Sequence, residues 1–290
     1  MKYKQCKIIS ELCCNHAGDI DIAKDMIKMS KLCGADYAKF QKRNNIKAVP
    51  IRLHNQPHPC PMHSFGETYL QHREALEFSL DQHRELQKYC EEVGIGYVCS
   101  VWDEDSARDI ISLSPDFIKV PSAMNENYLL LDILFNEYDG DIHISTGMIG
   151  KEAKAKLYNY LDNKKDRVVV YHTTSGYPVP FKELYLQEIS NIKEFFRAGY
   201  SGHHLGIAVD VCAYTLGATW IERHFTLDRT SKGTDHSASL EPIGLQKLCR
   251  DLKACYSSLN YKNIDMTEDE QENSRKLKVK TNNQGGRNDI

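Results

Sequence analysis

Short apolar runs alternate with amphipathic stretches along nearly the whole chain, and this order constrains the fold more than any other feature. It is typical of repeated strand and helix units that build a parallel sheet. We predict strands at residues 7–13, 36–40, 96–100, 116–120, 142–145, 167–171, 198–201 and 218–222. Helical patterns cover residues 20–33, 81–93, 105–113, 128–136, 151–162, 184–196, 206–216 and 242–259. Eight strands, each followed by a helix, predict an α/β fold, a single-domain TIM (β/α)8 barrel over residues 1–259.

Length and charge fit one barrel and exclude several other classes of protein. The chain has 290 residues, near the roughly 250 that such a barrel needs, so a large second domain would not fit. Its 37 basic and 40 acidic residues give a net charge of -3, which argues against a nucleic-acid partner. No apolar run is long enough to cross a membrane, and the first residues lack a signal-peptide pattern. We therefore expect a cytoplasmic protein whose ten cysteines stay reduced and behave as small hydrophobic residues.

Two segments stand outside the regular alternation. Residues 43–80 form a long, partly proline-rich connection after the second strand, and such connections on the strand-to-helix side are usually lids or specificity loops. Its histidines and cysteine do not have the spacing of a structural zinc site, which is therefore not favoured: His54, His58, Cys60 and His63. Residues 260–290 are polar, and we expect a loosely ordered C-terminal tail.

Polar residues follow the predicted strands at the edge where barrel enzymes hold their chemistry. Glu11 lies in the first strand, and the alternation of the second strand places Lys39 and Gln41 on one inward face. Lys119 and four serines end later strands or follow them: Ser100, Ser122, Ser145 and Ser201. Alone, either lysine would more often be a solvated side chain. Two lysines with hydroxyls and glycine-rich turns, however, suit an anion that carries both a phosphate and a carboxylate.

A dense group of ionisable residues follows the last strand. His224 belongs to it, and His203 comes from the end of the preceding strand, so both imidazoles can reach one divalent cation. Glu222 and Asp235 lie near in sequence and strengthen this interpretation. For three other histidines we expect structural or supporting roles: His16, His172 and His236.

Seven motifs occur in order between residues 7 and 258: ELCCNHAG from Glu11, GADYAKFQ from Gly34, IKVPS from Ile118, ISTGM from Ile144, GYPVP from Gly176, GYSGH from Gly199 and IERHFTLD from Ile221. With them the chain resembles the sialic acid synthase family, the phosphoenolpyruvate-dependent enzymes that make nonulosonic acids. The resemblance implies a barrel, a Mn²⁺ or Mg²⁺ ion, and condensation of phosphoenolpyruvate with N-acetylmannosamine or a closely related amino sugar. Acceptors that lead to legionaminic or pseudaminic acid stay open. So does a catalytically inactive barrel that binds a sugar or a partner protein.

The resemblance also implies a role for each matching residue. The metal ligands would be His203 and His224. The phosphate of phosphoenolpyruvate would be held by Lys119, Ser100, Ser122 and Ser145, and its carboxylate by Lys39 and Ser201. The acceptor sugar and a metal-bound water would face Glu11, Gln41, Tyr177 and Asp235. The catalytic set is then Glu11, Lys39, Lys119 and Asp235, with the carboxylate that activates the water left open between Glu11 and Asp235.

The chain also departs from the family's pattern. It has Met124 where many members have an acidic residue, and Ser175 where an amide is common. The resemblance stops before the family's small C-terminal antifreeze-like domain, which in many members reaches across a dimer to the partner's sugar site with an arginine. We therefore expect residues 43–80 to close the site instead. A homodimer remains the expected assembly.

Overall fold

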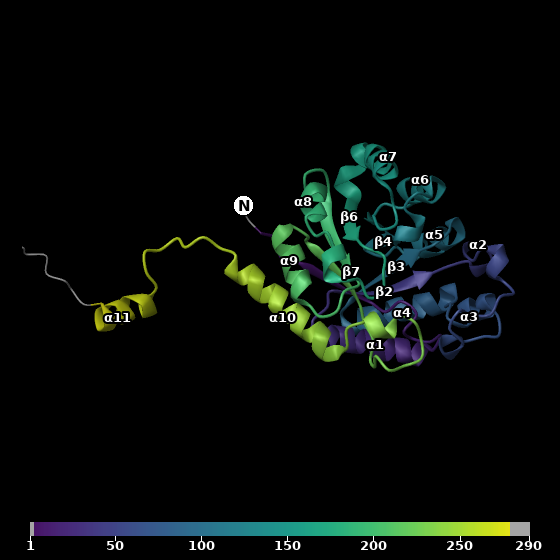
Figure 1. The fold of residues 1–290 in the computed structure, drawn as a ribbon, viewed down its shortest axis with the longest axis horizontal. Coiled ribbons are helices and arrows are strands. Elements are labelled where there is room, and N and C mark those ends of the chain that lie inside the picture. The colour runs from purple at the N-terminus through teal and green to yellow at the C-terminus, as the bar shows by residue number, and fades with distance from the viewer. Residues whose placement is uncertain (1–2, 279–290) are drawn as a thin grey trace, which may run out of the picture.

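The computed structural model describes residues 3–278, and Figure 1 shows a barrel ringed by helices. The strands are β1 (Lys7–Glu11), β2 (Tyr37–Lys42), β3 (Gly96–Val101), β4 (Phe117–Val120), β5 (Asp141–Ser145), β6 (Val168–Thr173), β7 (Arg197–Gly202) and β8 (Trp220–His224). They pair in parallel in sequence order, and β1 closes the barrel by pairing with β8. The predicted eight-stranded barrel is confirmed.

A helix follows each strand, as the sequence predicts. The eight helices are α1 (Ile20–Cys33), α4 (Leu80–Val93), α5 (Glu104–Ile111), α6 (Tyr128–Glu137), α7 (Lys151–Leu161), α8 (Glu188–Lys193), α9 (Ala208–Leu216) and α10 (Pro242–Ser258). Their apolar faces pack on the outside of the sheet, where Phe40, Leu86 and Ile118 belong to one continuous buried cluster. Within residues 3–278, none of the helices has the length and apolarity that a membrane crossing requires.

The observed strand boundaries lie within two residues of the predicted ones, and the differences in β1 and β8 shape the site. β1 ends at Glu11 rather than at residue 13, because Cys13 has a φ of 48°, in the left-handed region that a strand cannot use. β8 spans Trp220–His224 rather than 218–222, because Gly217 ends α9 in a left-handed conformation and delays the strand. His224 therefore lies within the sheet, paired with Glu11.

The barrel interior is divided between an apolar layer and a polar layer. Side chains nearer the amino-terminal ends of the strands fill the apolar layer: Ile9, Val98, Phe117, Val169 and Tyr171. Two residues further along several of these strands, the inward side chain becomes polar, as in the step from Phe117 to Lys119. The apolar layer thus closes the interior beneath the polar side chains, which can face only one another or a cavity.

The long connection at residues 43–80 is built from short helical segments. They are α2 (Asn45–Ala48), α3 (Tyr69–Ala75) and the single turns Ile51–Leu53 and Pro61–His63. The ring of His54 makes a local hydrogen bond to the carbonyl of Val49 at 2.9 Å, whereas His63 Nδ1 accepts a hydrogen bond from the distant backbone N–H of Gly233 at 3.1 Å. Within residues 3–278, the side chains grouped so that they could hold a metal ion lie outside this connection.

The C-terminal tail contains order that the sequence prediction missed. Residues Glu268–Leu277 form α11, which stands apart from the barrel in Figure 1 and has no buried residue. Its start carries a capping box between Thr267 and Glu270, and Arg275 and Lys276 lie in its last turn. Both features stabilise a helix without tertiary packing. The last predicted tail residues, 279–290, lie outside the described part of the chain.

Candidate active site

A cavity of about 260 Å³ opens at the carboxyl ends of the barrel strands. Its lining includes every site residue that the sequence analysis names: Glu11, Lys39, Gln41, Ser100, Lys119, Ser122, Ser145, Tyr177, Ser201, His203, His224 and Asp235. It also includes Glu222, which the sequence analysis placed beside the metal ligands, and residues that it did not place there, among them Cys13, Arg43 and Arg73. Residues from all eight strand ends therefore meet in one pocket.

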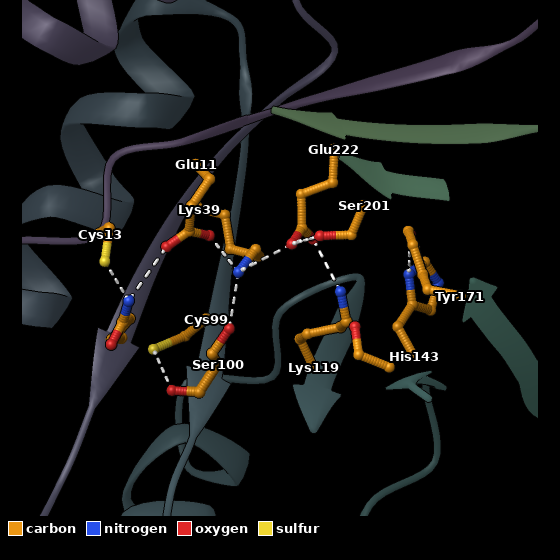
Figure 2. A network of polar contacts seen from close by, with 12 residues as sticks. Glu11, Cys13, Lys39, Cys99, Ser100, Lys119, His143, Tyr171, Ser201 and Glu222 are labelled. Carbon is orange, nitrogen blue, oxygen red and sulfur yellow. Dashed lines mark hydrogen bonds and ion pairs between the residues drawn. The ribbon is translucent and has the colours of Figure 1, made fainter. Parts of the chain in front are cut away.

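Four buried charges form a network across one side of the pocket (Figure 2). The ammonium of Lys39 pairs with the carboxylate of Glu11 on the neighbouring strand. Lys119 Nζ lies 2.9 Å from Glu222 Oε2, and Lys39 Nζ lies 3.7 Å from Glu222 Oε1. Glu222 thus bridges two lysines, and no charge in the network is left without an opposite charge.

The network gives its two lysines different acid strengths. Burial opposes the charge of Lys39, but Glu11 and Glu222 outweigh it and raise the pKa of Lys39. Burial lowers the pKa of Lys119 to about 8, only partly offset by Glu222. Burial would also raise the pKa of Glu222, but Lys119 and Lys39 dominate and hold that pKa below its usual value. Lys39 therefore stays protonated, whereas Lys119 is the more acidic of the two ammonium groups.

Serine hydroxyls surround the lysines. Lys39 Nζ donates to Ser100 Oγ at 2.7 Å, and Ser201 Oγ donates to Glu222 Oε1 at 3.1 Å. Ser122 Oγ accepts a hydrogen bond from the backbone N–H of Gly147 at 3.1 Å. A Cβ at Gly147 would lie 2.7 Å from Ser122 Oγ, so only glycine allows this close approach. The turn after β5 thereby brings backbone and hydroxyl groups together, as an anion site requires.

The two predicted metal ligands lie in the same pocket, His203 directly after β7 and His224 at the end of β8. Their ring centroids lie 5.4 Å apart. His203 Nδ1 donates to the carbonyl of Thr174 at 3.1 Å, which leaves its Nε2 free for a ligand. Burial and the neighbouring His224 lower the pKa of His203 to about 3, so its ring is neutral, as metal binding requires. His224 Nδ1 is buried and has no hydrogen-bond partner in the described part of the protein.

One group of side chains that includes His224 has ligand atoms close enough to share a cation. It comprises Cys13, His224 and Asp235, whose ligand atoms all lie within 4.8 Å of one another. Cys13 Sγ donates to Asp235 Oδ2 at 2.8 Å, and its pKa is raised by its contact with Cys14, by burial and by Asp235. His203 stands beside this group rather than within it. The group's nitrogen, oxygen and sulfur donors fit a divalent cation, and the unpartnered His224 Nδ1 is consistent with one.

Two arginines from the ends of the long connection complete the rim. Arg43 stacks on the ring of Trp102, with its guanidinium carbon 3.6 Å from the ring centroid. Arg73 donates to Cys14 Sγ at 3.6 Å, and a hydrogen bond from Cys13 together with these two arginines lowers the pKa of Cys14 to about 5. The Nε atoms of both arginines are buried without a partner in the described residues. The long connection therefore contributes charged groups to the pocket.

Residues behind the pocket hold these loops in place. Asn15 Nδ2 donates to the carbonyl of Phe225 at 2.8 Å and so ties the turn after β1 to the end of β8. The guanidinium of Arg223 is buried against Asp210 and donates to the carbonyl of His204 at 2.6 Å, which fixes the segment after His203. The histidines expected to be structural bond to protein atoms other than the site residues: His16 to Gly18, His172 to Leu184 and His236 to Thr226.

The structure corrects the sequence interpretation at two positions. Glu222 does not support the metal ligands; it lies two residues deeper on β8 than His224 and pairs with Lys39 and Lys119. Cys13, expected to be a small hydrophobic residue, has a polar environment. The inward alternation that places Lys39 and Gln41 in the pocket also leads to Arg43, so that signal was available in the sequence. Arg73 lies on α3 and had no comparable signal.

Comparison with known proteins identifies the family of the chain. The model of the NeuB family matches residues 26–263. The N-acetylneuraminate-9-phosphate synthase of Homo sapiens is 41% identical over 251 residues, which cover 86% of this chain and 69% of that protein. The N,N'-diacetyllegionaminic acid synthase of Campylobacter jejuni is 32% identical over 255 residues, which cover 86% of this chain and 76% of that protein.

A solved structure also aligns over most of the barrel. The N-acetylneuraminic acid (sialic acid) synthetase from Leptospira borgpetersenii serovar Hardjo-bovis has a TM-score of 0.78 and 25% sequence identity, and the alignment covers 94% of this chain and 91% of that one. The family resemblance inferred from the seven motifs is thus confirmed. The chain belongs to the NeuB family.

Proposed function

We propose that this protein condenses phosphoenolpyruvate with N-acetylmannosamine, or a closely related amino sugar, to give an N-acetylneuraminate-type acid and inorganic phosphate. One observation carries the proposal: a single pocket joins two buried lysines and a set of hydroxyls to two imidazoles and a carboxylate. The first set suits a small phosphorylated and carboxylated anion, and the second suits a divalent cation. The names of the relatives, which include N-acetylneuraminate-9-phosphate and legionaminic acid synthases, support the same reaction class.

The lysine network is the proposed site of phosphoenolpyruvate. Lys119, with the hydroxyls of Ser100, Ser122 and Ser145, holds the phosphate, and Lys39 with Ser201 holds the carboxylate. Lys119 Nζ lies 3.8 Å from the centroid of the Tyr171 ring, which limits where its charge can point. An arriving phosphate competes with Glu222 for the charge of Lys119.

The metal that the family implies would be held by His203, His224 and Asp235, and we propose Mn²⁺ or Mg²⁺ as its first candidates. When bound, such an ion supplies Lewis acidity to the open-chain aldehyde of the sugar. The protein's own share is to keep the imidazole of His203 neutral and to orient it. The hydrogen bond from His203 Nδ1 to the carbonyl of Thr174 does this for His203.

The reaction joins C3 of phosphoenolpyruvate to the aldehyde carbon of the sugar, while the aldehyde oxygen gains a proton. Positive character at C2 is quenched by water, which loses a proton, and the C2–O bond to phosphate then breaks. Glu11 is the proposed acceptor of that proton, because it contacts Lys39, and Lys39 holds the carboxylate attached to C2. Lys119 neutralises the charge of the departing phosphate.

A phosphorylated acceptor is a second candidate, favoured by the two arginines on the rim. Three relatives are named N-acetylneuraminate-9-phosphate synthase, and C9 of such a product comes from C6 of the acceptor sugar. An acceptor 6-phosphate needs a second anion site, and Arg43 and Arg73 have buried Nε atoms without a partner in the described residues. Comparing kcat/KM for N-acetylmannosamine and its 6-phosphate, in the parent and in Arg73→Gln, decides between the two acceptors.

The reaction itself is tested by release of phosphate from phosphoenolpyruvate in the presence of a panel of amino sugars and Mn²⁺. We expect release only when a suitable acceptor is present, with one nonulosonic acid formed per phosphate. If no sugar stimulated release, an inactive sugar-binding or partner-binding barrel would be the better interpretation. We further propose that the enzyme works in the cytoplasm. We also propose that it is a homodimer, and light scattering of the purified full chain tests this assembly directly.

A further inference from the structure

Cys13 occupies an unusual place in the pocket. It is buried, with 4% of its surface exposed, and its Sγ is one of three ligand atoms that lie within 4.8 Å of one another. Its backbone has a φ of 48°, a left-handed conformation that residues with a Cβ rarely adopt. An extended backbone at this position would point the side chain in another direction. The left-handed conformation therefore determines where the thiol of Cys13 lies.

The turn that holds Cys13 is firmly braced. The backbone N–H of Asn15 donates to the carbonyl of Leu12 at 2.9 Å, and its side chain donates to Ser239 Oγ at 2.9 Å. The second bond reaches the same loop that carries Asp235. The thiol and the carboxylate are therefore held together by the fold and do not meet through chance rotamers of exposed side chains.

The carboxylate beside Cys13 is not matched by a cationic side chain in the described residues. Across residues 3–278, Asp235 forms no ion pair with a lysine or an arginine, whereas Glu11 and Glu222 both do. His224 contributes an imidazole whose buried Nδ1 has no hydrogen-bond partner in the same range. A carboxylate, a thiol and an imidazole thus converge on one point. A bound cation would satisfy all three at once.

We propose that Cys13 is itself a ligand of the bound divalent cation, together with His224 and Asp235, and that its sulfur shifts the site's preference toward Zn²⁺, Co²⁺ or Fe²⁺. Thiolates favour these borderline metals, whereas Mg²⁺ and Mn²⁺ favour oxygen ligands. On binding, the thiol of Cys13 gives up its proton to solvent, and the hydrogen bond that it donates to Asp235 is replaced by bonds from both groups to the metal. The inference refines the metal site of the proposed function, but it is tested without reference to the reaction.

The test is a titration of the full chain with Co²⁺, followed by absorption spectroscopy. A sulfur ligand produces an intense charge-transfer band in the near ultraviolet, which nitrogen and oxygen ligands do not. We expect this band in the parent protein, its loss in Cys13→Ser, and its retention in Cys14→Ser. Cys14 is the matched control because its Sγ lies only 3.9 Å from that of Cys13.

Affinity supplies a second measurement. Competition with a chelator should show that Cys13→Ser weakens Zn²⁺ binding by more than about tenfold, the scale of effects at metal sites, while Mn²⁺ binding changes much less. Cys13→Gly guards against misfolding, because glycine adopts a φ of 48° without strain, and it should lose the band as well.

Three outcomes would overturn the inference: no Co²⁺ binding, Co²⁺ binding without the sulfur band, or loss of the band in Cys14→Ser alone. Each would leave the thiol of Cys13 as a hydrogen-bond donor to Asp235. The proposed reaction fails separately, when phosphate release does not respond to any sugar. A protein that shows the sulfur band but no turnover would keep the ligand assignment and lose the proposed function.

Discussion

Two parts of the pocket, the lysine side and the histidine side, differ in how their buried charges are balanced. On the lysine side, Lys39 and Lys119 are matched by Glu11 and Glu222, so the charges are balanced within the protein. On the histidine side, Asp235 and its neighbours His224 and Cys13 have no cationic side chain paired with them in the described residues. The charges of the lysine side are therefore balanced within the fold, and the histidine side is the proposed cation site.

This difference separates the contributions of the two sides to folding and to function. Breaking a buried ion pair leaves an uncompensated charge in a low-dielectric interior, which is costly for the fold. Removing an imidazole from the proposed cation site leaves no such charge, so the fold should change little and mainly binding should suffer. The lysine side should therefore respond to substitution in stability as well as in activity, and the histidine side mainly in activity.

The largest effect is expected from His203→Ala on the histidine side. We predict that metal-dependent turnover is abolished, because one of the two imidazoles facing the cation is lost. The free energy of unfolding of the metal-free protein should fall by about 1 kcal/mol or less, the value of its hydrogen bond to Thr174. Phosphate release and urea unfolding measure the two quantities. Unchanged turnover would reject the metal assignment, and a large loss of stability would break the contrast between the two sides.

Glu222→Leu should produce the largest loss of stability on the lysine side. It leaves Lys119 buried, at 1% side-chain exposure, without its partner, and such a loss typically costs about 3–5 kcal/mol. Urea unfolding measures it. In the double variant Glu222→Leu with Lys119→Met, most of the stability should return because no unpaired charge remains. A single variant as stable as the parent would mean that water already solvates Lys119.

Lys119→Met tests the same side through catalysis. The variant removes the cation proposed to face the leaving phosphate, and we expect kcat/KM for phosphoenolpyruvate to fall about 10²- to 10³-fold. Its stability should suffer less than that of Glu222→Leu, because Glu222 keeps Lys39 and Ser201 as partners. Lys154→Met is the matched control, since Lys154 pairs with Glu188 outside the pocket and should leave kcat/KM unchanged. Equal losses in both variants would argue against a specific phosphate contact.

The fold could be predicted from the sequence, because segments with the hydrophobic period of a strand alternate with segments that have the period of a helix through the whole barrel. The pocket residues at strand ends were readable for the same reason: alternation fixes which side of the strand a residue faces, as for Lys39 and Gln41. The depth of a residue within the pocket could not be predicted in this way. Glu222 and His224 face the same inward side of β8 and differ only in how far along the strand they lie. Arg73 could not be found either, since α3 reaches the pocket through tertiary packing alone.

The smallest expected effect is a pH dependence that distinguishes the two lysines. The pKa of Lys119 lies at about 8, below its ordinary value, so its charge is lost as the pH rises through 8; Lys39, with a raised pKa, keeps its charge. Lys119 also faces Glu11, Tyr171 and His143, but burial holds Tyr171 and His143 neutral in this range. We expect kcat/KM for phosphoenolpyruvate to fall about tenfold per pH unit above pH 8. In Glu222→Gln, which lacks the carboxylate that favours the ammonium, this decline should begin at lower pH. A decline that starts at the same pH in both proteins would show that another group controls it, and that the balance of charge on the lysine side does not tune Lys119.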